Sequence, residues 1–377
     1  MSGIYIHIPY CRQACHYCDF HFSTSLQNKT VMIAALIREI ELQASIYNKT
    51  LGKIKTLYFG GGTPSLLDKN ELGELISKVE SCFDLNDCEE ITLEANPEDI
   101  DENELNSWFE LGVNRLSVGV QSFENKLLKS TNRSHDAIQA KKAIRLINES
   151  QIENFTIDLM FGIPGYSTDQ WEKDLRIALE FNVPHLSVYG LTIEPKTVFG
   201  NWHSKGIMEE TTEDEMMWLF RHTHQMLVSS GYEHYEVSNY ALPNMQSKHN
   251  TAYWQGKSYI GIGPGAHSFD GLERRYNISN NNKYIESLGS DKLAHTIEYL
   301  TSTDRINETI FTSLRTIAGL DLGKLKEQFG KDLLHDHAKK IKSWEEMGLL
   351  EVREGYLRLT IDGMLLTDEI SLKLLYS

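Results

Sequence analysis

Six short runs rich in β-branched and aromatic residues recur along the first half of the chain, with amphipathic stretches between them. The runs cover residues 4–8, 56–59, 91–95, 115–120, 155–160 and 185–189. Most of them end close to Gly or Pro, as buried parallel strands do. Alternating strands and helices predict a parallel α/β sheet, and six such units predict a partial (β/α)6 TIM-like barrel. A doubly wound sheet has the same local pattern, so periodicity alone leaves both architectures open.

Two local patterns predict where helices lie between these strands. A set of apolar residues that share one helical face predicts a helix between the first two strands. These residues are Ile33, Leu36, Ile37, Ile40 and Ala44. Further along, Ser167 and Gln170 have the spacing of a capping box, which predicts that a helix begins just before Trp171.

The pattern changes after about residue 290. Residues 308–317, 322–329 and 333–347 predict helices, and residues 348–366 alternate like a hairpin. We therefore expect a barrel over residues 1–240, a connecting segment over 241–290, and a small winged-helix-like α+β domain over 291–377. The last domain has no basic stripe, so protein contact is a better interpretation than DNA binding.

Charge and hydropathy narrow the class of protein further. The formal net charge of −16 excludes a general nucleic-acid binder, because contacts with phosphates need a basic surface. No apolar run approaches the ~20 residues that span a bilayer, so we do not expect an integral membrane protein. The N-terminal residues show neither the basic nor the apolar region of a signal peptide. These features predict a cytoplasmic protein and leave a homo-oligomer open.

Three of the five cysteines lie in one short segment directly after the first predicted strand. Cys11, Cys15 and Cys18 form a C-x3-C-x2-C pattern. In a reducing compartment, such clustered thiols indicate a metal site more often than disulfides. A zinc ion would need a fourth ligand, for which His16 is the adjacent candidate. A [4Fe–4S] cluster on three thiolates would instead leave one iron open to another ligand.

Further polar or glycine residues stand at the ends of the next predicted strands. The second strand ends in Gly60-Gly61-Gly62-Thr63-Pro64, where the backbone can approach a ligand closely. Glu94, Gln121 and Asp158 lie near the ends of three later strands. Carboxylates in such positions are suited to ribose hydroxyls, as in other nucleotide sites. Together they predict a ligand site at one end of the barrel.

The cysteine pattern after the first strand and the GGGTP turn after the second resemble the radical S-adenosylmethionine (SAM) superfamily. The resemblance extends over nearly the whole chain to the oxygen-independent coproporphyrinogen III oxidase group. It implies a partial (β/α)6 barrel and a small C-terminal helical domain, and it makes the three cysteines ligands of a [4Fe–4S] cluster. It implies contacts with the cluster-bound SAM for Tyr5, Gly61 and Glu94. Matches to further SAM contacts are Tyr17, Gly62, Thr63, Gln121, Arg133 and Asp158, of which Arg133 would face a carboxylate.

This group contains two functional classes, which the sequence distinguishes. The oxidase decarboxylates two propionates of coproporphyrinogen III. Its motif continues with a cysteine where this chain has Phe20, and its N-terminal extension is longer than the ten residues that precede Cys11. The other class, a haem chaperone, has the hallmark HNxxYW. This chain carries that hallmark as His249, Asn250, Tyr253 and Trp254.

A neutral imidazole is a good axial ligand for haem iron, and Tyr253 and Trp254 offer flat apolar surface to a macrocycle. The alternative for His249 is a core histidine beside packed aromatic residues. His267 in the later segment GAHS is a second candidate ligand. We expect a protein that binds haem through His249 and passes it to acceptor proteins, with a [4Fe–4S] cluster and SAM as cofactors. The alternative function is the oxidase.

Overall fold

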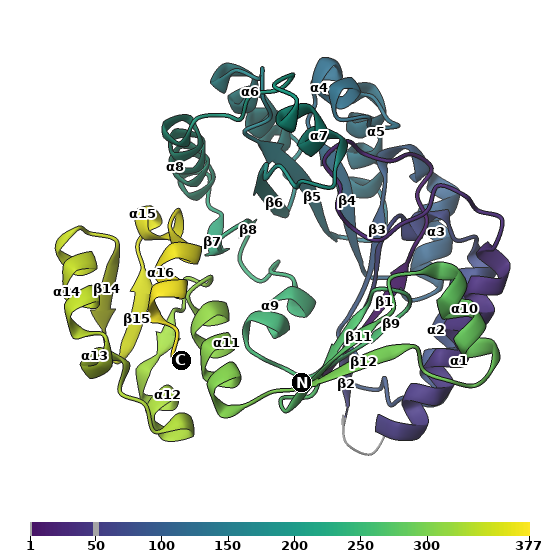
Figure 1. Ribbon diagram of the computed structural model, residues 1–377. Coiled ribbons are helices and arrows are strands. Elements are labelled where there is room, and N and C mark those ends of the chain that lie inside the picture. The colour runs from purple at the N-terminus through teal and green to yellow at the C-terminus, as the bar shows by residue number, and fades with distance from the viewer. Residues whose placement is uncertain (1, 48–52) are drawn as a thin grey trace.

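The six predicted strands are present and pair with one another in parallel. The computed structural model describes residues 2–47 and 53–377, and Figure 1 shows one large curved sheet beside a smaller C-terminal domain. The strands are β1 (Ser2–Ile8), β2 (Ile54–Gly61), β3 (Glu90–Ala95), β4 (Arg115–Gln121), β5 (Asn154–Phe161) and β6 (His185–Gly190). They are adjacent in chain order, as the barrel prediction requires.

Helices cover the outer, convex side of these strands (Figure 1). They are α1 (Lys29–Tyr47), α2 (Lys69–Cys82), α3 (Glu102–Glu110), α4 (Asn125–Ser130), α5 (Ala137–Asn148) and α6 (Thr168–Glu180), with short 3-10 turns at Pro64–Leu66 and Pro97–Asp99. The predicted apolar face of α1 is confirmed: Ile33, Leu36 and Ile40 are buried, and Ile37 and Ala44 pack against the same core. The predicted start of α6 is also confirmed, because the Ser167 side chain accepts a hydrogen bond from the Gln170 amide.

The sheet continues beyond both ends of the six-stranded unit. After α7 (Val198–Ser204) and α8 (Glu213–Ser229), the strands β7 (Glu233–Glu236) and β8 (Asn239–Ala241) extend the edge at β6 with antiparallel pairing. At the other edge, β9 (Tyr259–Ile262) lies parallel to β1. The antiparallel strands β10 (His267–Phe269), β11 (Glu273–Asn277) and β12 (His295–Tyr299) follow it.

The segment over residues 241–290, expected as a connection, therefore supplies strands to the main sheet. It also contains α9 (Lys248–Trp254) and α10 (Asn281–Gly289). The sheet over the described residues has twelve strands, and β12 and β7 are its two edges, so the barrel stays open. None of the helices in the described part of the chain is long and apolar enough to cross a bilayer.

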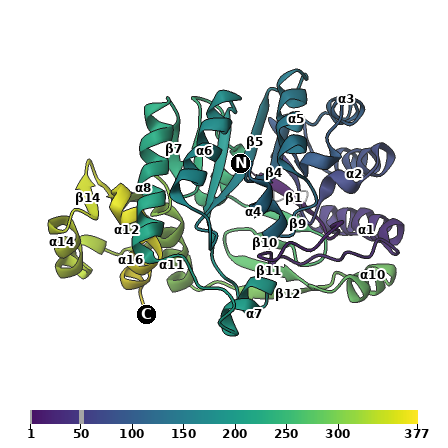
Figure 2. The ribbon, with the colours of Figure 1, turned by 90° about the horizontal axis from the view of Figure 1, so that it is seen from above.

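The C-terminal domain combines helices with a three-stranded sheet. Its elements are α11 (Ser302–Ser313), β13 (Leu320–Asp321), α12 (Leu322–Phe329), α13 (Leu333–Asp336), α14 (Ala338–Glu346), β14 (Leu350–Arg353), β15 (Tyr356–Leu359), α15 (Ile361–Met364) and α16 (Thr367–Leu374). Figure 2 shows this domain at one end of the molecule, next to α8.

Three details of this domain differ from the sequence prediction. The first helix begins earlier and ends at Ser313, and the helix predicted over 333–347 is divided at His337. The hairpin is confirmed for β14 and β15, but the residues after it form α15 because Thr360 caps a helix there by accepting from the Gly363 amide. A side chain at Gly363 would overlap the Leu349 carbonyl oxygen, so this helix packs closely on the segment before β14.

Candidate radical SAM site

The three clustered cysteines lie in the loop between β1 and α1, at the carboxyl end of the parallel strands. This loop is held by hydrogen bonds to the turn between α4 and α5. The Gln13 side chain donates to Asn132 Oδ1 (2.6 Å), the Asn132 side chain donates to the Ala14 carbonyl (2.7 Å), and the His16 amide donates to the Thr131 carbonyl (3.0 Å). Asn132 has a left-handed backbone with φ of 57°, which Asn tolerates better than most residues. The loop is therefore positioned before any ligand binds.

His16, the candidate fourth ligand for zinc, has other partners. Its Nδ1 donates to the Ser130 carbonyl (2.9 Å), and its ring packs edge-on against Trp202 at 4.9 Å between centroids. Within residues 2–47 and 53–377, no three His, Cys, Asp or Glu side chains are arranged to hold one metal ion. A [4Fe–4S] cluster does not need three side chains around one ion, because each thiolate binds a different iron atom.

The electrostatics of the three thiols fit a cationic group. Burial raises the pKa of Cys11 to about 11, and the neighbouring Cys18 and Cys15 raise it further while Thr63 and Arg133 oppose the change. Burial likewise raises the pKa of Cys18, with Cys15 adding to it. Negative charge on one thiolate thus disfavours negative charge on its neighbours. The iron of a cluster would neutralise the three thiolates. The residues fit a [4Fe–4S] cluster.

Arg133 connects the cysteine loop to the ends of the strands. Its Nη1 donates to Cys15 Sγ and Tyr17 Oη, both at 3.5 Å, and its Nη2 donates to Asn96 Oδ1 (2.7 Å) and the Gly119 carbonyl (2.5 Å). Its buried Nε has no hydrogen-bond partner among the described residues. A buried cation with an unused donor fits an anionic ligand group such as the carboxylate of SAM.

Sequence reasoning missed Asn96, which accepts from Arg133 and also donates to Thr63 Oγ1 at 3.4 Å. The residue stands two positions after Glu94 and directly before Pro97, at the end of β3. A polar side chain at a strand end was the available signal, and the same rule selected Glu94, Gln121 and Asp158. Asn96 joins the predicted residues Arg133 and Thr63 into one network.

The glycine turn after β2 has its amides engaged within the protein. The Gly61 amide donates to Glu94 Oε2 (3.0 Å), and the Gly62 amide donates to the Ile8 carbonyl (2.9 Å). The other Glu94 oxygen accepts from Tyr58 Oη (2.8 Å), and burial raises the pKa of Glu94. Gly61 has a left-handed backbone with φ of 109°. These glycines are required by close packing against β1 and the loop after it.

We expect Gly62→Ala to lower the free energy of unfolding by about 1–3 kcal/mol, as overpacking does. A Cβ at Gly62 would lie 2.5 Å from the Tyr10 carbonyl oxygen and 2.8 Å from that of Ile8, so backbone would have to move. Urea unfolding followed by circular dichroism measures the change. Gly289→Ala is the control, because nothing lies within 4 Å of a Cβ there. Equal stability of the two variants would contradict this explanation of Gly62.

Gln121 is the last residue of β4, and Asp158 lies within β5, where it pairs with Gly119 of β4 and Ser187 of β6. Gln121 is buried and has φ of 67°, which is uncommon for a residue other than Gly, and the register between the two strands shifts next to it. Burial raises the pKa of Asp158 to about 7, with the charge of Glu94 as the second cause. Strained backbone and carboxyls of raised pKa cluster at functional sites. Tyr5, on β1, donates from its hydroxyl to His7 Nδ1 at 3.0 Å.

The HNxxYW residues form α9 (Lys248–Trp254), whose first residues are bonded to Glu90 at the start of β3. Ser247 caps the helix by accepting from the Asn250 amide, and the carboxylate of Glu90 accepts from the amides of Lys248 and His249, both at 2.9 Å. Three N–H groups at the start of a short helix are thus satisfied. The position of this motif depends on a carboxylate that lies about 160 residues earlier in the chain.

His249 lies inside the barrel, with its side chain engaged on every side. The residue is 2% exposed, its Nδ1 is hydrogen-bonded to Thr56 Oγ1 (2.7 Å), and its Nε2 is hydrogen-bonded to Tyr253 Oη (2.7 Å). The ring stacks on Tyr58 at 4.9 Å between centroids. Burial lowers the pKa of His249 to about 3, so the imidazole is neutral. In this conformation, neither nitrogen is available to iron until one of these hydrogen bonds breaks.

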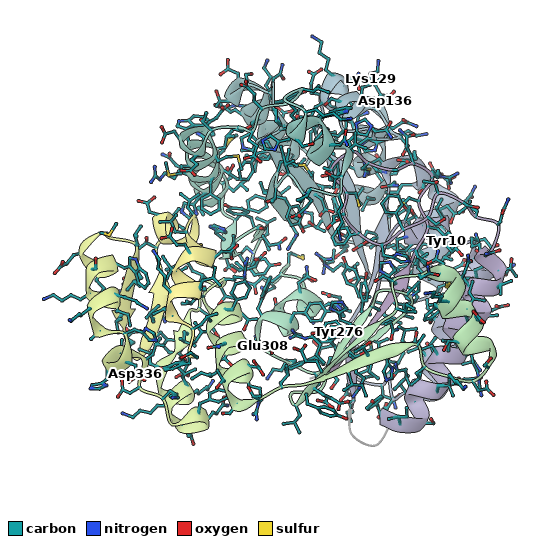
Figure 3. The ribbon with its side chains drawn as sticks, viewed as in Figure 1. Tyr10, Lys129, Asp136, Tyr276, Glu308 and Asp336 are labelled. Carbon is teal, nitrogen blue, oxygen red and sulfur yellow. The ribbon has the colours of Figure 1, made fainter. Side chains whose placement is uncertain are left out.

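A cavity of about 1440 Å³ lies between residues 19–21, which directly follow the three cysteines, and α9 and the C-terminal domain. Tyr5 and Phe20 line it on the side of the loop, and Tyr253 and Trp254 line it on the side of α9. In Figure 3, Tyr276 of β11 and Glu308 of α11 lie where the large sheet meets the C-terminal domain. The volume exceeds the ~300–1,000 Å³ of most small-molecule sites, which suits a large flat ligand.

Comparison with known proteins agrees with this fold. Residues 5–178 match the model of the radical SAM superfamily, and residues 300–366 match that of the HemN C-terminal domain. The solved structure of coproporphyrinogen III oxidase (HemN) from Escherichia coli, a radical SAM enzyme, superposes with a TM-score of 0.84 at 24% identity. That superposition covers 99% of this chain and 89% of the oxidase chain. The fold and the cysteine loop define a protein of the radical SAM class.

Relatives of higher sequence identity show which family within the radical SAM class this chain resembles. Heme chaperone HemW of Bacillus subtilis (strain 168) is 34% identical over 372 residues, which are 98% of each chain. Heme chaperone HemW of Escherichia coli (strain K12) is 40% identical over 269 residues, 70% of this chain and 69% of the relative. The chain therefore belongs to the HemW family.

Proposed function

We propose that this protein binds haem and transfers it to acceptor proteins, and that it carries a [4Fe–4S] cluster and SAM. The observation that carries the proposal is the large cavity, which is lined at one side by residues 19–21, directly after the three cysteines, and at another by the HNxxYW helix. Its aromatic lining suits a porphyrin, because flat apolar rings bury large area against a macrocycle. The names of the HemW relatives support the same function.

The residues of the strand ends have distinct proposed tasks. Cys11, Cys15 and Cys18 hold the cluster, and the unused donor of Arg133 receives an anionic group of SAM. Glu94, Gln121 and Asp158 line the same end of the barrel, where carboxyl and amide groups are suited to the polar parts of SAM. When bound, the cluster supplies an electron and an open iron for SAM. The protein itself binds and orients these groups.

The HNxxYW motif contributes Tyr253 and Trp254 to the wall of the proposed haem site, with Asn250 partly buried on the same helix. That His249 ligates haem iron stays a prediction, and it requires the hydrogen bond to Tyr253 to break. In the conformation described, His249 holds the Tyr253 hydroxyl at 2.7 Å and so fixes the ring at the cavity wall.

Haem titration under argon tests the proposal. We expect the wild type to bind haem and to lose it to an added apo-haem protein, as followed by the Soret band. We expect His249→Ala to weaken binding by roughly tenfold, as loss of a ligand or of its supporting partner does. His335→Ala is the matched control, because that side chain is 86% exposed on α13. Wild-type protein that binds no haem would refute the proposed function.

The oxidase remains the alternative, and the same preparation tests it. Phe20, at the position where the oxidase motif continues with cysteine, is 74% exposed and lines the cavity. We expect no protoporphyrinogen from coproporphyrinogen III with SAM and a reductant. Formation of that product would establish the oxidase reaction in place of a purely carrier function.

A further inference from the structure

One wall of the cavity is an aromatic face of the sheet formed by β9, β10 and β11. Tyr259 pairs with Phe269 across β9 and β10, and His267 pairs with Tyr276 across β10 and β11. His267 and Phe269 are two residues apart, so they lie on the same face of the sheet. The rings of His267 and Tyr276 pack edge-on at 4.7 Å between centroids. Tyr253 of the HNxxYW helix packs edge-on against Tyr259 at 4.5 Å, which joins the two walls.

The cavity contains three histidines, and they differ in how their rings are engaged. His7 uses both nitrogens, because Nε2 donates to the His21 carbonyl (2.8 Å) and Nδ1 accepts from Tyr5. His21 uses Nε2 in a hydrogen bond with Asn281 Oδ1 (2.7 Å). His267 is exposed to the cavity, and its ring forms no hydrogen bond with any residue that the structure describes. It is thus the histidine in the cavity wall whose two nitrogens remain available.

The backbone of His267 is held in place by its neighbour strand. A Cβ at Gly261 would overlap the His267 carbonyl oxygen, so β9 and β10 approach each other more closely there than a side chain would permit. The Ser268 hydroxyl accepts from the Gly261 amide at 2.9 Å. Burial and the charge of Arg274 lower the pKa of His267, which favours the neutral imidazole that binds metals. An imidazole on a rigid strand is prepared to bind a ligand.

Two cations in the cavity wall suit the anionic groups of a porphyrin. Lys257 and Arg305 line the cavity, and neither forms an ion pair with another residue in the described part of the chain. Arg274, on the aromatic face, pairs with Glu308 of α11 at 2.7 Å. In a chain with a net charge of −16, unpaired cations beside aromatic rings favour a flat ligand that carries carboxylates.

We propose that His267 is an axial ligand of haem iron, with Tyr259, Phe269 and Tyr253 packed around the macrocycle and Lys257 and Arg305 facing its propionates. This inference rests on the proposed function and names the ligand that the function needs. His249 does not fill that role in this conformation, because Thr56 and Tyr253 engage both of its nitrogens.

Electron paramagnetic resonance and resonance Raman spectra of bound ferric haem test the ligand under argon. The full-length wild type is compared with His267→Ala, His249→Ala and His335→Ala. We expect His267→Ala to change the axial-ligand signals and His335→Ala to leave them unchanged, and we expect the haem affinity of His267→Ala to fall at least about tenfold, as loss of metal-site interactions does. Added imidazole should restore the original signals to His267→Ala. Circular dichroism checks that this variant folds, which we expect because the side chain is exposed.

Each alternative outcome has a separate meaning. Unchanged axial-ligand signals in His267→Ala would overturn this inference. If those signals were lost only in His249→Ala, the ligand would be His249 and the proposed function would stand. If the wild type bound no haem, the inference and the proposed function would fail together.

Discussion

Protein carrying Cys15→Ser is expected to stay colourless after anaerobic incubation with iron and sulfide. Three thiolates are the only protein ligands proposed for the cluster, so loss of one leaves a second iron without its ligand, and a serine hydroxyl is a poor substitute for a soft thiolate. The substitution also removes the sulfur that accepts from Arg133 at 3.5 Å. Iron and acid-labile sulfide should fall close to zero, while the wild type is brown. Chemical analysis measures the iron and sulfide contents, and the visible spectrum measures the colour.

Cys82→Ser is the matched control for this experiment. Cys82 is a free cysteine in α2 that packs against the core, away from the loop after β1. Its replacement should leave the iron content of the reconstituted protein unchanged. Retention of a full cluster by Cys15→Ser would show that this cysteine is not a ligand and would remove the basis for the SAM site.

The strands that the sequence predicted are those whose burial is nearly continuous. In β4, six of the seven residues are buried, and such runs stand out because both faces of a parallel strand are covered. The strands that the sequence did not predict have five residues or fewer, and some of them carry charged residues, as ERRYN in β11 and HTIEY in β12 show. The place of β9 depends on its pairing with β1, about 250 residues away, and no local pattern contains that information.

The candidate site also has features that the sequence predicted and features that it could not predict. The spacing of Cys11, Cys15 and Cys18 predicted their proximity, because eight residues of one loop cannot separate them widely. The surroundings of His249 could not be predicted, since Thr56 and Tyr58 come from β2 and meet it only after the sheet has formed. The motif therefore identified the residues but not their helix, and tertiary packing decided which of their side chains reach the cavity.

Glu90→Ala is expected to lower the free energy of unfolding by about 3–5 kcal/mol, the range for one partner removed from a buried ion pair. Glu90 and Arg115 each have side chains 2% exposed and lie 3.9 Å apart. The substitution leaves the Arg115 cation buried without its counterion. It also leaves the amides of Lys248 and His249 without their acceptor at the start of α9. Urea unfolding measures the stability, and haem titration should show weaker binding because Tyr253 and Trp254 are on that helix.

Two further variants separate this role from a general effect of removing a carboxylate. Glu89, the preceding residue, is partly exposed and pairs with Lys248 (2.6 Å) and Lys55 (3.0 Å) in solvent. Glu89→Ala should therefore change stability far less than Glu90→Ala, since exposed ion pairs contribute little. Glu90→Gln should fall between the two, because its amide oxygen still accepts from one backbone amide while the charge opposite Arg115 is gone. Equal losses from Glu89→Ala and Glu90→Ala would mean that this buried carboxylate does not hold α9 against the sheet.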